Sequence, residues 1–306
     1  MMQLRQKWEV TSPKDLFNIG LFILMILLYA PIVLRWYDGW LNKNISTEHE
    51  YFSYGLIGLP YAAYLIWKNR HQWATLRTRC HPLGPLLIGL ALYLYAAGSP
   101  QPVFLSFPIM LIGISLWFKG IPGLRLNWFP LFLIFLATPN PIPYLLAPYT
   151  LGLQKFIATV AGLILTHLGI NVQVDGIYLL VNERLVEVAP YCAGLKMLFT
   201  SLYVALILLH WTGRLGNRSI TALILMGAAG ISITANILRN TLLTWFHGTG
   251  QDANFEILHS GWGGDLYSAL MLLVIVGLLK HIEWWQLNWQ TNQIDDDEGE
   301  YESIEN

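Results

Sequence analysis

One of the two cysteines in the chain stands in a setting that suits a nucleophile. Cys192 lies in the stretch VEVAPYCAGLKML, after Pro190 and at the start of a long apolar run, with Lys196 four residues later. Residues four apart share one face of a helix, and a thiolate is favoured by nearby positive charge and by a helix N-terminus. The stretch therefore predicts a reactive thiol, although a lone cysteine in such a run is more often a small packing residue.

Two further residues offer what acyl transfer to a thiol requires. His259 can take the thiol proton and return it to a leaving amine. Arg239 is always protonated and can stabilise an oxyanion. Taken alone, Arg239 can also be read as snorkelling to lipid headgroups and His259 as a solvated loop residue. His247 lies before the same loop and is an alternative base.

The composition places this chemistry in a membrane protein. Of the 306 residues, 55% are hydrophobic and 12% are charged, about half the charged fraction of soluble domains. The net charge of −1 gives no indication of nucleic-acid binding. The two cysteines are far apart and form no CxxC pair, and we find no cluster of metal ligands. We therefore expect no metal and no cofactor.

Apolar runs recur along the chain and predict an all-α polytopic membrane protein. We expect about eight transmembrane helices, at 16–36, 51–67, 82–98, 102–118, 127–140, 192–210, 219–246 and 262–280. The basic loop Lys68–Arg79 should be cytoplasmic by the positive-inside rule. The N-terminus and the turn with Arg214 and Arg218 should then also lie inside. This orientation puts Cys192, Arg239 and His259 at the same, outer face.

The same orientation leaves both ends of region 144–191 outside. We therefore predict that apolar segment 146–168 is an interfacial helix. The alternating stretch 171–189, with Asp175-Gly176 and Asn182-Glu183 as turn residues, predicts a small extracytoplasmic β-hairpin. Residues 1–286 should form one membrane domain, followed by an acidic, disordered cytoplasmic tail at 287–306.

These residues together resemble a known family. The run from Pro190 to Lys196 (PYCAGLK), the run from Asn236 to Arg239 (NILR) and the later His259 are similar in order and spacing to motifs of the exosortase/archaeosortase family of membrane cysteine transpeptidases. The likeness includes the prolines of TPNPIP, and the aromatic-rich spans look like those of cyanobacterial members. Ala193 and Lys196 depart from the serine and arginine usual there.

The resemblance implies a catalytic trio and a substrate class. Cys192 would be the nucleophile, Arg239 the oxyanion stabiliser and His259, or in its place His247, the acid/base. The enzyme would cleave exported proteins at a C-terminal, PEP-type sorting tail through a thioester, without a cofactor, at the outer face of the plasma membrane. The cleaved protein would pass to an acceptor such as a membrane lipid or lipid-linked precursor, with an accessory membrane protein as a further partner.

Supporting residues and competing functions complete the expectation. Lys196, Asn236 and Glu187 are candidates to support the site, Glu187 by orienting the histidine or binding an amine. A transporter or channel using Arg239 and Asp265 is the alternative from another class, and a structural or assembly subunit is a third. A thiol oxidoreductase is disfavoured because the second cysteine, Cys80, should lie on the cytoplasmic side, and exchange chemistry needs a resolving thiol.

Overall fold

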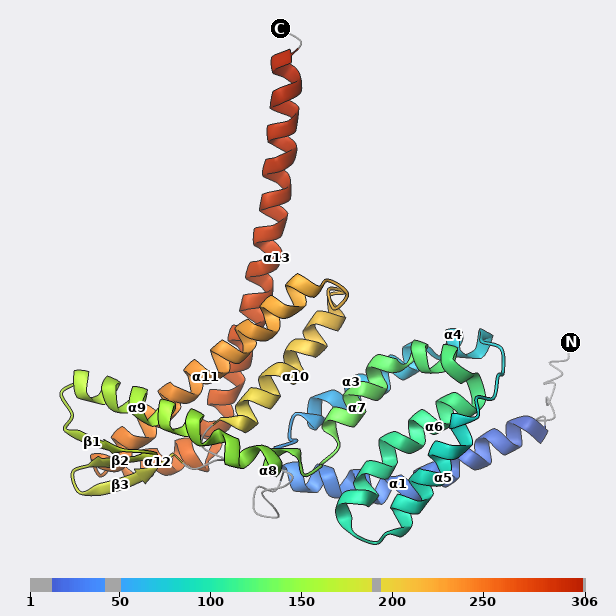
Figure 1. Cartoon of the computed structure of the whole chain (residues 1–306), viewed down its shortest axis with the longest axis horizontal. Helices are drawn as coiled ribbons and strands as arrows, with labels where there is room; N and C mark the ends of the chain where they lie inside the picture. Colours follow the sequence, from blue (N-terminus) through green and yellow to red (C-terminus); the bar gives the residue numbers. More distant parts are fainter. Residues whose placement is uncertain (1–12, 42–50, 189–193, 305–306) are drawn as a thin grey trace, which may run out of the picture. The chain divides into compact units, whose positions relative to one another are not determined.

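The computed structural model describes residues 13–41, 51–188 and 194–304. It is mostly helical, as predicted, and it divides into two compact units, Met1–Asn140 and Pro141–Asn306 (Figure 1). The sequence suggested one membrane domain up to residue 286, and the division after Asn140 was not part of that prediction. The two units are described separately below.

Unit 1 contains helices only, within its described residues. They are α1 (Pro13–Leu41), α3 (Gly55–Lys68), α4 (Arg70–Thr75), α5 (Leu83–Ala96), α6 (Pro100–Leu126) and α7 (Trp128–Ala137). Glycines let α5 and α6 approach closely, since a Cβ on Gly84 would lie 2.7 Å from the backbone nitrogen of Trp117. The course of α6 is broken at Gly120, where φ of 60° and ψ of −153° are accessible essentially only to glycine.

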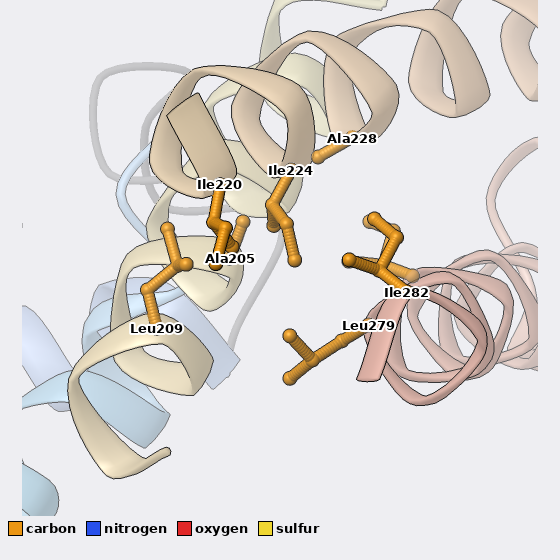
Figure 2. Close-up of a cluster of buried hydrophobic side chains, with 8 residues drawn as sticks. Ala205, Leu209, Ile220, Ile224, Ala228, Leu279 and Ile282 are labelled. Atoms are coloured by element: carbon orange, nitrogen blue, oxygen red, sulfur yellow. The ribbon is translucent and has the colours of Figure 1, made fainter. Parts of the chain in front are cut away.

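Unit 2 combines helices with a small sheet. Its helices are α8 (Ile142–Leu146), a 3₁₀ turn (Ala147–Thr150), α9 (Leu151–His167), α10 (Leu195–Trp211), α11 (Arg218–Gly248), α12 (Asp252–His259) and α13 (Trp262–Ile304). The core of its bundle lies between α10, the first half of α11 and the middle of α13. Figure 2 shows side chains from these three helices pointing toward one another, among them Leu209, Ile224 and Leu279.

The predicted hairpin region forms one strand more than expected. Strands β1 (Val172–Asp175), β2 (Tyr178–Val181) and β3 (Arg184–Glu187) make an antiparallel sheet in the order β1-β2-β3. The second turn uses Asn182 and Glu183, both with positive φ (49° and 65°), as tight two-residue hairpin loops require. We predicted a single hairpin, whereas the second turn leads into a third strand.

The sheet packs against the side of α9. Leu179 of β2 is buried in a cluster with Ile157 and Ala161 of α9 and Ile237 of α11, and Figure 1 shows α9 running beside the strands. Pro148–His167 is long and apolar enough to cross a membrane. However, a sheet carrying Glu183 and Glu187 beside this helix would be costly in hydrocarbon. The interfacial position of α9 stays a prediction.

Five helical stretches of the described chain meet the length and composition of a membrane span. They are Ile23–Leu41, Pro100–Leu126, Pro148–His167, Arg218–Gly248 and Trp262–Trp285, with three shorter apolar helices, Leu83–Ala96, Trp128–Ala137 and Leu195–Trp211. Four of the five coincide with predicted spans, and the shorter helices coincide with three more. The count of eight spans stays a prediction.

The acidic segment at the C-terminus differs from expectation. The helix α13 continues through it to Ile304, whereas we predicted a disordered tail from residue 287. Extending a helix that is already nucleated costs less than starting one, which offsets the low helix propensity of Asp295, Asp296, Asp297 and Gly299.

Candidate active site

The sequence-predicted residues that the structure describes gather at one end of unit 2. The bundle core uses Ala205 of α10, Ile224 of α11 and Ile275 of α13. Asn236 and Arg239 lie three to four turns further along α11. The start of α10, the end of α12 and the start of α13 lie at that same end, so three separate segments meet there. Cys192 itself lies outside the described residues.

Gly194, two residues after Cys192, packs on Asn236. It precedes α10 with φ of 81°, a left-handed conformation that residues with a side chain rarely adopt. A Cβ built on Gly194 would lie 2.6 Å from Cγ and 2.7 Å from Nδ2 of Asn236. The glycine of the cysteine motif is therefore required twice, by its backbone conformation and by the amide against it.

Asn236 is buried and only partly satisfied. Its side chain is 1% exposed, and its Oδ1 accepts a hydrogen bond from Nδ2 of Asn240 at 3.3 Å. Its own Nδ2 has no hydrogen-bond partner in the structure described here. Leaving a buried donor unsatisfied costs about 1–3 kcal/mol, and such groups in native proteins call for an explanation.

A polar stripe on α11 extends the site and was missed from the sequence. Ser232, Asn236, Asn240 and Thr244 recur every four residues and are all buried, so they form one face of α11. A polar face within a helix apolar enough to cross a membrane is unusual and points to function. The four-residue spacing of these polar residues was the signal available in the sequence.

Arg239 binds the end of helix α12. Its Nη2 donates to the backbone oxygens of Leu258 at 3.3 Å and of His259 at 3.2 Å. These carbonyls lie at the helix C-terminus, where the backbone oxygens lack helical partners and carry partial negative charge. Arg239 and His259 are thus brought together, but through the backbone of the histidine and not through its ring.

Glycines make the junction between α12 and α13 tight enough for this contact. A Cβ on Gly264 would lie 2.9 Å from the oxygen of Leu258 and 3.8 Å from Nη2 of Arg239. Tyr267, one turn later on α13, donates from its hydroxyl to the oxygen of Ala235 at 2.6 Å. The start of α13 is therefore held against the segment of α11 that carries Asn236 and Arg239.

The two candidate histidines contact the same aromatic ring, that of Phe255. His259 is exposed and stacks on Phe255, with centroids 5.1 Å apart and an interplanar angle of 10°. The ring centroid of His247 lies 5.2 Å from that of Phe255, with the two rings tilted by 48°. Both imidazoles are therefore near each other at the α12 end of the site, and the geometry alone leaves either available as a base.

His247 is tied to the sheet as well. Its Nδ1 lies 3.6 Å from Oδ1 of Asp252, and the same carboxylate pairs with Nη1 of Arg184 on β3 at 2.7 Å. Arg184 also donates to the oxygen of His247 at 3.1 Å, and Asn182 donates to the oxygen of Gly248 at 2.9 Å. His247 therefore sits in a fixed structural setting, whereas His259 ends a short helix.

The remaining predicted residues have mixed placements. Lys196 lies in the first turn of α10 and is half-buried, and Glu187 is exposed at the end of β3. Asp265, which the transporter alternative needs, is exposed in the first turn of α13. Among the described residues, no group of three or more His, Cys, Asp or Glu side chains is placed to hold a metal ion.

Comparison with known proteins agrees with the motif pattern. The family model described as Transmembrane exosortase (Exosortase_EpsH) matches residues 40–276. This range covers more than half of the chain and includes the segments of Cys192, Asn236, Arg239 and His259. No curated protein and no solved structure matches the chain.

Proposed function

Because the chain belongs to the transmembrane exosortase family, we propose that it is a cysteine transpeptidase that cleaves exported proteins at a C-terminal sorting tail. The observation that carries this proposal is the meeting of Gly194, Asn236, Arg239 and the end of α12 at one end of unit 2. Nothing in the bundle core requires these residues at that end. Their types and order match what thiol acyl transfer needs.

The first half of the reaction releases the tail. His259 accepts the proton of the Cys192 thiol, and the thiolate attacks the carbonyl carbon of the scissile peptide bond. The carbonyl oxygen becomes an oxyanion, which Arg239 stabilises. The C–N bond then breaks, the tail amine leaves with the proton from His259, and the exported protein stays on Cys192 as a thioester.

The second half transfers the protein. A nucleophilic group of the acceptor attacks the thioester carbonyl, and His259 takes the proton of that group. The C–S bond breaks and returns the thiol. A lipid or lipid-linked precursor in the outer leaflet is the acceptor that suits a site at the outer boundary of a plasma-membrane protein.

The two contacts of Arg239 leave donors for this role. A guanidinium has five N–H donors in a fixed plane, and the two bonds to Leu258 and His259 come from Nη2. The donors on Nε and Nη1 then keep a defined direction, because the two carbonyls fix the plane of the group. Preorganised donors of this kind stabilise a developing charge without reorganisation.

Three residues support the trio in this proposal. Asn236 packs on Gly194 and positions the backbone that carries Cys192 two residues earlier. Lys196, in the first turn of α10, adds positive charge near the thiolate. Glu187 binds the incoming amine or orients the histidine from the exposed end of β3.

The experiment follows a secreted reporter that carries a PEP-type sorting tail from the same genome. Its size is measured by gel with the intact protein, without it, and with Cys192→Ala. Shortening only with the intact cysteine supports the proposal, and processing by Cys192→Ala would falsify it. No processing, with the protein present in the membrane, means a different tail or a transporter, and solute flux in proteoliposomes that survives Cys192→Ala separates the latter.

A further inference from the structure

A long apolar groove runs along unit 1, and its lining residues all belong to that unit. It has a volume of about 760 Å³, and its walls come from α1 and α6, among them Met25, Ala30 and Ile114. Along both helices it spans thirteen residues, and therefore twelve helical rises, from Leu21 to Val33 and from Phe107 to Lys119. At about 1.5 Å per residue this is about 18 Å, close to the hydrocarbon depth of one leaflet, about 15 Å.

The two ends of the groove differ. Toward one end Tyr29 of α1 contacts α6, with its hydroxyl 3.2 Å from Oγ of Ser106 and its ring centroid 5.1 Å from that of Phe107. At the other end the lining becomes polar, with Trp73, Thr78 and Lys119. Tryptophan and lysine at the end of an apolar wall are typical of the membrane–water interface.

The polar end is built from a loop that is fixed to α6. Nζ of Lys119 donates to the backbone oxygen of Leu76 at 2.6 Å. The backbone nitrogen of His81 donates to the backbone oxygen of Leu116 at 3.1 Å. The oxygen of Arg79 lies 3.0 Å from where a Cβ would be on Gly120. The loop 76–81 therefore follows α6, and the exposed Arg77 and Arg79 are carried by backbone held beside Lys119.

The segment that supplies α6 and the loop carries charge of one sign, whereas α1 has two cations and two carboxylates, Lys14, Asp15, Arg35 and Asp38. From Tyr51 to Val174 the sequence contains no aspartate and no glutamate. Over the same range it carries six cations between Lys68 and Arg125, which are Lys68, Arg70, Arg77, Arg79, Lys119 and Arg125. The ammonium group of Lys119 has three N–H donors, and one of them donates to the backbone oxygen of Leu76. The mouth of the groove therefore suits an anion.

We infer that this groove binds an anionic phospholipid of the cytoplasmic leaflet. One acyl chain lies between α1 and α6, and the phosphate lies at Lys119 beside Arg77 and Arg79. The apolar length requires a chain, and the cations select the headgroup. Basic pockets between membrane helices on the cytoplasmic side bind such headgroups in general. The inference is independent of the proposed transpeptidase activity.

The test measures lipid binding to the purified full-length protein in detergent, by native mass spectrometry and by thermal unfolding. The probes are phosphatidylglycerol, phosphatidylcholine with the same acyl chains, and inorganic phosphate. We expect one tightly bound phosphatidylglycerol with a raised melting temperature, weaker binding of phosphatidylcholine, and no effect of phosphate. Equal binding of the two lipids overturns the inference, and protection by phosphate alone reduces the site to one for a small anion.

Variants separate the headgroup contact from the chain contact. Lys119→Gln should weaken phosphatidylglycerol binding about fivefold, the effect of about one cation near the surface, and leave phosphatidylcholine unchanged. Lys155→Gln, an exposed lysine on α9, is the matched control and should change neither. Because Lys119 also holds the loop, Ala30→Phe is a second variant, which fills the groove and should abolish binding of both lipids. Unchanged phosphatidylglycerol binding in both Lys119→Gln and Ala30→Phe contradicts the inference.

Discussion

The backbone of Gly194 packs directly on the side-chain amide of Asn236, with no room for a Cβ between them. This contact joins the start of α10, two residues after Cys192, to the part of α11 that ends in Arg239. It means that two residues 42 positions apart in the sequence are parts of one structural arrangement. The contact can be tested by changing either side of it.

Gly194→Ala should destabilise the protein by about 2–4 kcal/mol, from the left-handed backbone and the overlap with Asn236. Processing of a tail-bearing reporter should fall with it, because the start of α10 must move. The measurement is thermal unfolding in detergent together with the reporter assay. Gly277→Ala, in α13 with nothing within 4 Å of the new methyl, is the control and should keep stability and processing. A Gly194→Ala protein as stable as the wild type would show that the contact is loose.

Asn236→Ala should relieve part of that penalty. Removing the amide removes the two closest atoms to the new methyl, at 2.6 and 2.7 Å, and leaves Cβ of residue 236 at 3.0 Å. In the Asn236→Ala background, Gly194→Ala should therefore cost mainly the backbone term, about 1–2 kcal/mol. A double-mutant cycle measures the difference as a coupling free energy, and strict additivity of the two changes would exclude direct contact.

The Asn236→Ala single variant also tests positioning. Because Nδ2 of Asn236 has no hydrogen-bond partner in the described structure, the substitution should lower the free energy of unfolding less than removal of a fully hydrogen-bonded buried amide would. We expect a lower kcat with KM nearly unchanged, because the substrate is not bound by this residue. A purely structural role would instead lower the amount of folded protein and leave the kcat of the remaining enzyme intact.

Arg239→Lys should lower kcat about 10²–10³-fold, the effect of losing one oxyanion donor. Lysine keeps the charge but lacks the planar fork that spans the oxygens of Leu258 and His259 at 3.3 and 3.2 Å. Arg218→Lys, at the other end of α11 and exposed, is the matched control and should process normally. Retained activity in Arg239→Lys would mean that charge suffices and that the fixed plane has no role.

Much of this arrangement follows from sequence, for identifiable reasons. Membrane topology places Arg239 and His259 at one face, because the lengths of apolar runs and the positions of cations constrain where each helix ends. Turn chemistry identifies the sheet region, because Asn182-Glu183 and Asp175-Gly176 are local signals. The structure forms a sheet in that region, with a third strand, and brings Arg239 to the backbone of His259, while the membrane orientation stays a prediction.

The parts that the sequence did not reveal depend on tertiary packing. No local pattern says that Arg239 binds backbone oxygens at the end of α12, because the partner carbonyls belong to a different helix. Likewise, the glycine in the cysteine motif has no visible reason until Asn236 is placed against it. The packing of the sheet against α9 is likewise a tertiary contact, which the hydropathy of the helix alone does not report.

The choice between the two histidines gives the last prediction. His259 ends α12 with its ring exposed and stacked on Phe255, whereas His247 is held beside Asp252 and Arg184. A residue that must reach both the thiol and the leaving amine needs access to substrate, which favours His259. His259→Gln should then lower kcat about 10²–10⁴-fold, the range of general acid–base catalysis.

His247→Gln should lower kcat only about tenfold, because it loosens the end of α12. This smaller effect corresponds to about 1.4 kcal/mol. Phe255→Leu, which removes the ring that both histidines contact, should lower kcat by an intermediate factor because His259 loses its stacking partner. Single-turnover cleavage of the reporter measures each rate, and trapping the thioester with hydroxylamine shows whether acylation or transfer has slowed. The reverse order, with His247→Gln inactive and His259→Gln active, would assign the proton transfer to His247.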